Sequence, residues 1–300
     1  MRGGEDTGAA RAGLTTVSGG GASSRAWRRE VREGRRFAFG NNWRRYARVL
    51  DEDRIDQARR SLEVMLGDGS LRGRSFLDVG SGSGLFSLAA RQLGARVFSF
   101  DYDPDSVECT RELRERFDLD HEDWQIERGS VLDPEFMRSI GEFDIVYAWG
   151  VLHHTGQMYA ALDEVTRRVT SGGMLYIAIY NDCGIRARYW RGVKRLYCSG
   201  LIGRLVVCSL YLPYFFIGRL AKSLLNGRDQ FRAYRERRGM SAVYDWFDWL
   251  GGYPYEVARP EDLFRFLRDR GFALRELVTV DGLGINELVV QRVGGVSPDR

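Results

Sequence analysis

The residues best suited to chemistry form a glycine-rich loop with an acid at its start, Asp78–Gly84, directly after the apolar pair Phe76-Leu77. Glycine at every second position lets the backbone approach a ligand closely. A helix beginning after the loop would favour a negative group at its N-terminus. A dinucleotide-binding loop, G-x-G-x-x-G, needs a third glycine where this sequence has Leu85. The loop therefore points to a ligand other than a dinucleotide.

A second acid, Asp101, ends the next predicted strand. A carboxylate at that place can accept hydrogen bonds from both ribose hydroxyls of a nucleoside. Tyr102 follows it directly, and Gly129-Ser130-Val131 comes after the third predicted strand. The alternative is a structural glycine turn accompanied by a surface aspartate.

Together these residues resemble the class I S-adenosylmethionine-dependent methyltransferase family, in which D-x-G-x-G-x-G holds the methionyl and ribose parts of the cofactor. The resemblance implies that S-adenosyl-L-methionine is the cofactor. It places Tyr102 beside the adenine and the Ser130 region at the adenine edge, although many members carry an acid at the Ser130 position. The implied cofactor-binding residues are Asp78, Gly80, Gly82, Gly84, Asp101, Tyr102, Ser130 and Val131.

The loop after the fourth predicted strand, Trp149–Gly156, also resembles the family, and there it meets both cofactor and acceptor. It carries the pair His153-His154. A hydroxyl acceptor with a pKa near 10, such as a phenol, benefits from a base near neutral pH, and histidine suits that task. We therefore predict His153 or His154 as catalytic base; the alternative is that the pair only shapes the loop. We predict that Trp149 packs on the cofactor; the alternative is that it packs on the core.

Residues from four separate segments are expected to surround the entrance to the acceptor site. Phe37–Trp43 and Asp245–Glu256 look like segments of a recurring subgroup of uncharacterised bacterial methyltransferases, and the resemblance extends over residues 36–292. The predicted acceptor contacts are Trp43, Tyr180, Asn181, Tyr253, Tyr255 and Asn286. The alternative is that these are turns with packing aromatic residues.

The elements that position these residues alternate between strand and helix. Strands are expected at 75–79, 96–100, 124–128, 143–148 and 174–180, with helices after the glycine loop to residue 93 and at 104–117 and 157–169. Asp103 can cap the helix that begins at Pro104. This alternation predicts an α/β, Rossmann-like, doubly wound and mostly parallel sheet of seven strands. A helix at 260–270 and strands at 273–280 and 287–292 complete it.

The alternation stops between Asp182 and about Arg238, which we interpret as an inserted helical lid over the carboxyl ends of the strands. A helical cap precedes the sheet. The expected organisation is a disordered tail (1–25), a helical cap (26–70), the cofactor-binding core (71–182), the lid (183–240), the C-terminal part of the core (241–293) and a short tail (294–300).

The lid is both apolar and basic. Aromatic residues such as Tyr189, Trp190 and Phe215 suit ordinary packing, an apolar acceptor pocket, or contact with a membrane surface. Its most apolar stretch, Leu201–Leu225, is interrupted by Arg204 and Arg219 and contains Pro213, so we do not expect a transmembrane helix. The lid position is similar to that in O-methyltransferases of ubiquinone biosynthesis.

Composition limits the remaining classes. The chain has 45 Lys+Arg against 41 Asp+Glu, so its net charge of +4 does not call for a nucleic-acid partner, although residues 1–60 hold 14 arginines. Its four cysteines form no C-x-x-C pair, and no metal site is expected. Cysteine usage and an N-terminus without an apolar core predict a cytoplasmic protein, with a peripheral membrane contact through the lid as an open alternative. The sequence predicts no oligomeric state.

The leading hypothesis is O-methylation of a small apolar or aromatic metabolite, because a histidine pair lies beside an aromatic lid. One alternative is an RNA or protein methyltransferase that docks through its basic N-terminus. Another is a cofactor-binding module without catalysis that acts as a membrane or partner adaptor.

Overall fold

The computed structural model describes residues 20–67, 69–117, 119–120, 122–227 and 242–294. Most of the tail predicted at 1–25, most of the tail at 294–300 and the end of the predicted lid lie outside these residues. Within them, Gly20–Arg32 forms helix α1, so a helix begins inside the segment we expected to be disordered.

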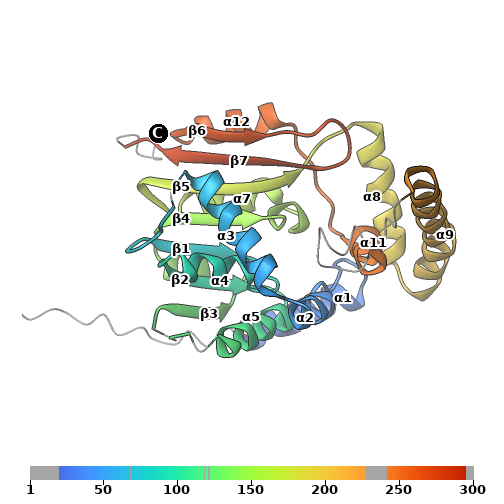
Figure 1. The fold of residues 1–300 in the computed structure, drawn as a ribbon, viewed down its shortest axis with the longest axis horizontal. Helices are drawn as coiled ribbons and strands as arrows, with labels where there is room; N and C mark the ends of the chain where they lie inside the picture. The colour runs from blue at the N-terminus through green and yellow to red at the C-terminus, as the bar shows by residue number, and fades with distance from the viewer. Residues whose placement is uncertain (1–19, 68, 118, 121, 228–241, 295–300) are drawn as a thin grey trace, which may run out of the picture.

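A single seven-stranded sheet organises the chain (Figure 1). Its order is β3-β2-β1-β4-β5-β7-β6, and all neighbouring pairs are parallel except those that β7 makes with β5 and β6. The strand bounds are β1 Ser75–Val79, β2 Arg96–Asp101, β3 Trp124–Arg128, β4 Phe143–Trp149, β5 Val169–Tyr180, β6 Phe272–Val278 and β7 Ile285–Arg292. The prediction of a doubly wound, mostly parallel sheet is confirmed. Strand order reverses between β1 and β4, and ligands bind at such a switch point.

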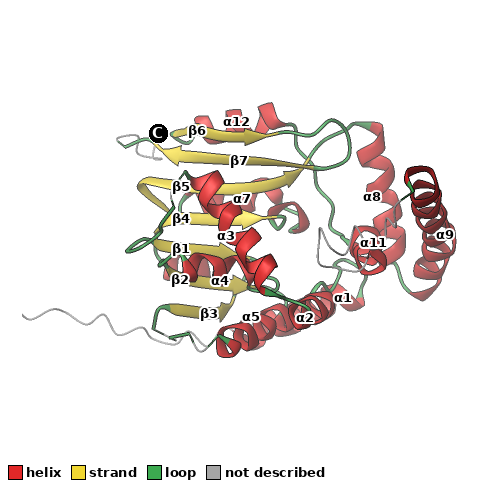
Figure 2. Ribbon diagram, viewed as in Figure 1, coloured by secondary structure: helices red, strands yellow, loops and turns green. Residues whose placement is uncertain are grey.

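Helices cover both faces of the sheet (Figure 2). Two separate apolar clusters of buried residues form the core, one on each face of the sheet. Both faces are apolar because helices cover a parallel sheet on both sides. The helices of one face are α3 (Glu52–Leu66), α4 (Leu85–Gln92) and α5 (Pro104–Arg116), and those of the other are α6 (Pro134–Ser139), α7 (Met158–Thr166) and α12 (Pro260–Arg268).

Local sequence explains where these helices begin and end. The carboxylate of Asp103 accepts the Asp105 backbone N–H at the start of α5, where Pro104 is the first helical residue, as predicted. Asp133 and Pro134 repeat the arrangement at α6, a helix that our sequence analysis did not predict. Gly67 ends α3 with φ of 71°, a left-handed conformation that glycine adopts without steric cost.

The segment 33–51, which we expected to be helical throughout, is broken on either side of α2 (Gly40–Arg48). This helix packs on α5 at the carboxyl ends of the strands. The approach is close because Gly40 has no side chain: a Cβ there would lie 2.4 Å from Cβ of Asp105. The Gly40 N–H donates to the Asp103 carboxylate at 2.9 Å. Of the predicted cap, α1 and α2 therefore lie beside the switch point, whereas α3 covers the sheet.

The lid consists of α8 (Ile185–Cys198), α9 (Leu201–Asn226) and α11 (Ala242–Gly251), which share a third apolar cluster. We assigned α11 to the C-terminal part of the core, and this boundary is corrected: Leu250 is fully buried among lid residues. Figure 1 shows all three helices beyond the carboxyl ends of β1–β5, with α9 outermost.

The apolar stretch that we described as interrupted by Arg204 and Arg219 forms one continuous helix, α9. It continues through Pro213 for 26 residues. A proline removes one backbone hydrogen bond, and a long helix tolerates this loss where the freed carbonyl remains exposed. By length and composition alone, Leu201–Leu225, with a mean hydropathy of 1.7, is one described helix that could cross a membrane.

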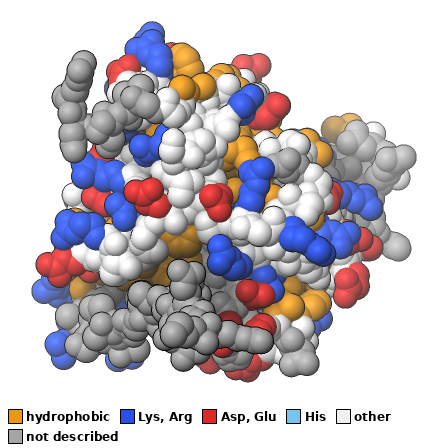
Figure 3. Space-filling model, turned by 90° about the vertical axis from the view of Figure 1, so that its left-hand side faces the viewer, with side chains coloured by type: hydrophobic (Ala, Val, Ile, Leu, Met, Phe, Trp, Pro, Cys, Tyr) orange, Lys and Arg blue, Asp and Glu red, His pale blue; other side chains and the backbone are white. Residues whose placement is uncertain are grey.

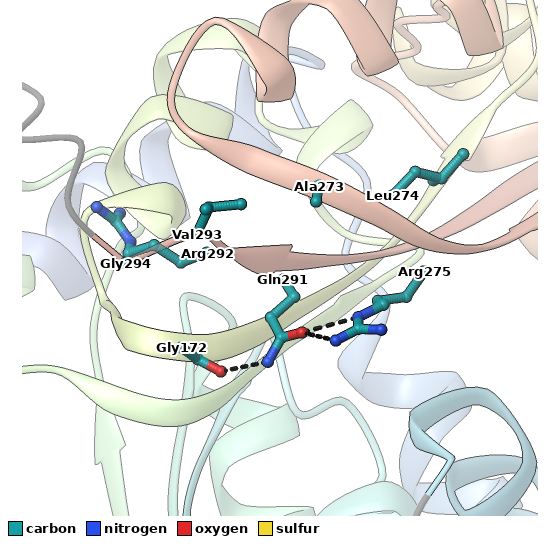
Figure 4. Close-up of a pocket in the computed structure, with 8 residues that line it drawn as sticks. All are labelled: Gly172, Ala273, Leu274, Arg275, Gln291, Arg292, Val293 and Gly294. Carbon is teal, nitrogen blue, oxygen red and sulfur yellow. Dashed lines mark hydrogen bonds between the residues drawn. The ribbon is translucent and has the colours of Figure 1, made fainter.

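The opposite end of the molecule carries no predicted site residue. Acidic and basic side chains are interspersed over that face (Figure 3). A shallow hollow of about 500 Å³ lies there between β6, β7 and the turn at Gly172. Gln291 crosses it, donating to the Gly172 carbonyl and accepting from Arg275 (Figure 4). These hydrogen bonds join strand ends, and we assign the hollow no function.

Candidate active site

The glycine loop lies between the carboxyl end of β1 and the start of α4. Gly80, Gly82 and Gly84 all have positive φ, of 73°, 55° and 80°. The N–H groups of Gly80 and Ser81 donate to the Phe100 carbonyl and so bind the loop to β2. A Cβ on Gly80 would lie 2.6 Å from the Val151 side chain. The predicted need for glycine thus has two causes, backbone conformation and a close approach to the loop after β4.

Asp78 supports this loop from beneath. Its carboxylate is buried and accepts a hydrogen bond from Ser87 of α4, whose hydroxyl also contacts Ser99 of β2. Burial raises the pKa of Asp78 to about 6, although the Ser87 hydrogen bonds oppose the rise. The side chain therefore joins β1, β2 and α4, and its contribution to ligand binding is to hold the loop.

Asp101 ends β2 beside the loop. Its two carboxylate oxygens accept the backbone N–H groups of Gly82 at 3.0 Å and Asp103 at 2.8 Å. Burial, reinforced by the neighbouring charge of Asp103, raises the pKa of Asp101 to about 7. Each carboxylate oxygen has a second lone pair, so both remain able to accept a ligand hydroxyl.

The residues predicted near the adenine lie around the end of β2. The ring of Tyr102 has the guanidinium of Arg36 at 5.0 Å and that of Arg128 at 6.0 Å from its centroid. Ser130 uses its hydroxyl in a local turn, accepting the Leu132 N–H at 3.2 Å. Val131 is buried in the core. At these last two positions the backbone is the part available to a ligand.

Trp43 lies on the cofactor side of the site. We predicted it as an acceptor contact, but its ring covers the glycine loop: a Cβ on Gly82 would meet the indole at 3.1 Å. Helix α2 places it there because Gly40 lets the helix approach α5. Trp149, at the end of β4, is 36% exposed, so its ring is not confined to the core.

The two histidines differ in accessibility. His153 is fully buried, with its ring centroid 4.1 Å from that of Tyr180. His154 is half-buried, and its Nδ1 lies 2.7 Å from the Pro254 carbonyl. A carbonyl can only accept, so Nδ1 carries the proton and Nε2 is left as the basic atom. Burial lowers the pKa of His154 to about 3, with Lys194 and Arg36 adding repulsion, so this imidazole is neutral at pH 7.

An aromatic cluster extends from the histidines into the lid. Tyr180, at the end of β5, lies 5.1 Å from Tyr255 and 5.8 Å from Trp249 between ring centroids. The ammonium group of Lys194 lies 4.1 Å from the Trp249 ring centroid and is fully buried. Of the predicted acceptor contacts, Tyr180 and Tyr255 thus belong to one cluster, and Tyr253 lies on the segment that joins it to the cap.

Asn181 and Asn286 form a separate unit. Asn286 is fully buried; its amide donates to Asn181 and accepts from the Val280 N–H. The Asn181 amide donates to the carbonyls of Val280 and Gly282. These hydrogen bonds hold the β6–β7 turn beside Tyr180 and bury Asn286, so the structure gives Asn286 a supporting role, whereas contact of Asn181 with the acceptor stays a prediction.

Two connections escaped the sequence analysis. Arg36 of the cap donates to the backbone carbonyl of His154 at 2.9 Å and forms an ion pair with Glu30 at 2.7 Å. The Glu256 N–H donates to the His153 carbonyl, and the Glu256 carboxylate accepts the first N–H of α7, that of Met158. No local pattern marks either residue, because each partner is distant in sequence.

Comparison with known proteins decides the family. Residues 77–177 match the model of a methyltransferase domain. The chain carries a class I S-adenosylmethionine-dependent methyltransferase domain. The match spans β1 to β5, which include the glycine loop, Asp101 and the histidine pair, so the family resemblance is confirmed for this core.

Curated relatives of this methyltransferase domain differ in their acceptors. The chain is 30% identical over 114 residues to a ubiquinone biosynthesis O-methyltransferase of Xanthomonas campestris, covering 37% of this chain and 45% of that protein. It is 47% identical over 58 residues to a ribosomal protein L11 methyltransferase of the same species, 19% of each chain. The chain spans less than half the length of these two relatives.

Two solved structures align with most of the methyltransferase chain. The magnesium protoporphyrin IX methyltransferase of Synechocystis is 15% identical, with a TM-score of 0.47 and coverage of 91% of this chain and 95% of that one. The 1,6-didemethyltoxoflavin N1-methyltransferase of Burkholderia thailandensis is 16% identical, with a TM-score of 0.47 and coverage of 95% and 93%.

The residues present fit S-adenosylmethionine, the cofactor of this domain. The Asp101 carboxylate retains lone pairs suited to ribose hydroxyls. The loop from Gly80 to Gly84 presents backbone without side chains at the N-terminus of α4. Tyr102 offers an aromatic face at the adenine position. Among the described residues, no group of three or more His, Cys, Asp or Glu side chains could hold a metal ion.

Proposed function

We propose that the chain transfers the methyl group of S-adenosylmethionine to an oxygen of a small apolar or aromatic acceptor. The observation that carries the proposal is the aromatic cluster of His154, Tyr180, Trp249 and Tyr255 at the carboxyl ends of β4 and β5, beside the glycine loop. Aromatic walls with few polar groups favour a flat, apolar ligand.

His154 supplies the polar group in this proposal. S-adenosylmethionine provides an activated methyl group when it is bound. A hydroxyl of the acceptor would donate to Nε2 of His154, which the Pro254 carbonyl leaves unprotonated. As the acceptor oxygen gains a carbon substituent its proton becomes strongly acidic, so even an imidazole with a low pKa can accept it. The chain's other contribution is to hold the two reactants in line.

A second candidate is methylation of a protein. The similarity to ribosomal protein L11 methyltransferases favours it, although that similarity covers only 19% and 34% of this chain in the two relatives. The lid favours a small acceptor, because Lys194 of α8 and Trp249 of α11 pack on the aromatic cluster.

The test is a methyl-transfer screen with S-adenosylmethionine labelled in its methyl group. The full chain is incubated with simple phenols, catechols, primary amines, ribosomal proteins and RNA, and Asp101→Ala serves as the cofactor-binding control. The proposal expects label in a phenol or catechol. Label only in protein, RNA or amines would reject it, and cofactor binding without transfer to any class would favour a non-catalytic role.

A further inference from the structure

The outward face of α9 is apolar and exposed in the described structure. Eleven of its large apolar side chains are exposed, with exposed fractions from 43% at Val206 to 84% at Leu225. In the most apolar part of the helix, only 11% of the residues are buried. Exposed patches of this size on soluble domains mark interaction sites. The exposed residues are Leu201, Ile202, Leu205, Val206, Leu210, Tyr214, Phe216, Ile217, Leu220, Leu224 and Leu225.

The inward face of the same helix is fixed to the protein. Val207, Tyr211 and Phe215 recur every four residues and so share one side of α9. Val207 is buried, and the Tyr211 ring lies 5.3 Å from Trp190 of α8. Phe215 lies 5.6 Å from Trp246 of α11. Because α9 lies along two other helices, a spanning orientation would carry the basic helix α8 into the bilayer. The packing favours a helix that lies flat on a surface.

The charge of the lid identifies that surface. Residues 185–226, which form α8 and α9, contain eight basic residues and no acidic one. On α9 the cations lie at the border with the protein: the Arg204 guanidinium is over the Tyr197 ring and that of Arg219 over the Trp246 ring. On α8 the arginines at 186, 188, 191 and 195 are exposed. An apolar face bordered by cations is the arrangement that binds anionic lipid.

We propose that the outward face of α9 is a docking surface for an anionic lipid bilayer. Its apolar side chains enter the acyl boundary, and the arginines and lysine of α8 and α9 contact the headgroups. This inference rests on the lid alone and holds whatever the acceptor is. It also places the aromatic cluster close to the membrane. Trp190 of α8 contacts Tyr211 of α9, and its ring lies 5.4 Å from Trp249, which in turn contacts Tyr180 of the cluster.

The test is co-sedimentation of the full chain with vesicles of phosphatidylcholine alone or with one third phosphatidylglycerol. The variant Leu210→Glu, Ile217→Glu, Leu224→Glu changes the outward face. Its matched control, Val64→Glu, Leu283→Glu, Val293→Glu, makes the same charge change at exposed apolar positions outside the lid. Circular dichroism and S-adenosylhomocysteine binding check that both variants are folded.

We expect the wild type and the control to bind the anionic vesicles at least about tenfold more tightly than the α9 variant does. Their binding to neutral vesicles should be weaker by a similar factor. Added salt should weaken binding, since the headgroup contacts are electrostatic. Equal binding by the α9 variant, or no binding by the wild type, would overturn the proposal. So would a wild-type dimer in gel filtration that the α9 variant converts to monomer without any lipid binding, which would make this face an interface between two copies.

A second variant tests the charge separately. Arg188→Gln, Arg195→Gln, Lys222→Gln keeps the apolar face and removes three exposed cations. The proposal expects weaker binding to anionic vesicles with a smaller salt dependence and unchanged transfer to a soluble acceptor. An unchanged salt dependence would contradict the headgroup contacts.

Discussion

Arg36 donates a hydrogen bond from Nη1 to the backbone carbonyl of His154 at 2.9 Å. Through it the N-terminal cap contacts the loop that carries the candidate base. The same guanidinium pairs with Glu30 and lies over the Tyr102 ring, so one side chain touches α1, the adenine position and the loop after β4. The cap is thereby a structural part of the site.

Arg36 is therefore expected to act as a positioning residue. Arg36→Gln should lower kcat by about ten- to a hundredfold, because a charge-assisted hydrogen bond to the loop is worth roughly 1.5–3 kcal/mol. Arg36→Lys should not restore it, since an ammonium group cannot contact Glu30, Tyr102 and His154 together. Arg35→Gln, an exposed neighbour, is the control and should be silent. Steady-state kinetics with each variant decide this, and a fully active Lys variant would contradict it.

Asp101 is expected to contribute to the affinity of the protein for its cofactor. Asp101→Ala removes the acceptor for two ribose hydroxyls, and hydrogen bonds to a charged group contribute about 1.5–3 kcal/mol, so S-adenosylhomocysteine should bind roughly ten- to a hundredfold more weakly. Calorimetry measures the change. Asp105→Ala, at the start of α5 where the carboxylate pairs with Arg44 at 3.0 Å, should retain nearly wild-type affinity. Equal affinities in the two variants would show that the ribose is held elsewhere.

The raised pKa of Asp101 predicts a pH dependence of binding. With a pKa of about 7 in the free protein, the carboxyl is partly protonated at pH 7 and must lose its proton to accept two hydroxyls. Affinity should therefore rise with pH up to about 7 and level off above it, with a slope of at most about tenfold per pH unit below that point. Calorimetric titrations between pH 5.5 and 8.5 test this. Asp101→Asn should flatten the profile, and a wild-type profile that is already flat would contradict the assignment.

His154 is expected to affect catalysis and leave cofactor binding unchanged. His154→Ala should lower kcat for a phenolic acceptor by about 10²–10⁴-fold, the usual range for a positioned proton acceptor. S-adenosylhomocysteine affinity, measured in parallel, should change little, and thermal melting shows whether the loop remains folded. Because the pKa of His154 is lowered to about 3, its protonation should not reduce kcat between pH 5.5 and 8 at saturating cofactor. Unchanged turnover in His154→Ala would remove the base assignment.

Gly80 should tolerate no side chain. Gly80→Ala places a Cβ 2.6 Å from Val151 and forces an L-residue to a φ of 73°, so both stability and cofactor affinity should fall. Gly73→Ala has a similar φ of 79° but open space around its Cβ, so it should lose only the roughly 1–2 kcal/mol of backbone strain. The difference between the two variants in urea unfolding isolates the contact with Val151. Equal losses would mean that conformation alone explains the glycine.

Much of the fold could be predicted because its signals are local. The order of strands and helices follows from apolar spacing, and Asp103-Pro104 marks a helix start through contacts within the same turn. Glycine at 80, 82 and 84 together with Asp78 and Asp101 identifies the cofactor loop in the same way, since the ligand is held by backbone at fixed spacing. The sheet was predicted from these local patterns, and the cofactor from the resemblance of the loop and of Asp101 to class I methyltransferases.

The acceptor side was decided by tertiary structure. Our sequence analysis could not separate His153 from His154, because only packing against Tyr180 buries the first and only the Pro254 carbonyl fixes the tautomer of the second. It placed Asn286 at the entrance to the acceptor site, whereas hydrogen bonds across the β6–β7 turn bury it.

The same limit explains the cap and the lid. Trp43 covers the glycine loop, and α11 belongs to the lid, through contacts that no local pattern encodes. The exposure of one face of α9 also follows from what the rest of the chain covers. Sequence therefore determined the elements, which depend on neighbouring residues, and the loop motif whose family resemblance implied the cofactor. Tertiary structure decided which side chains meet, because burial and hydrogen-bond partners come from residues far apart in the chain.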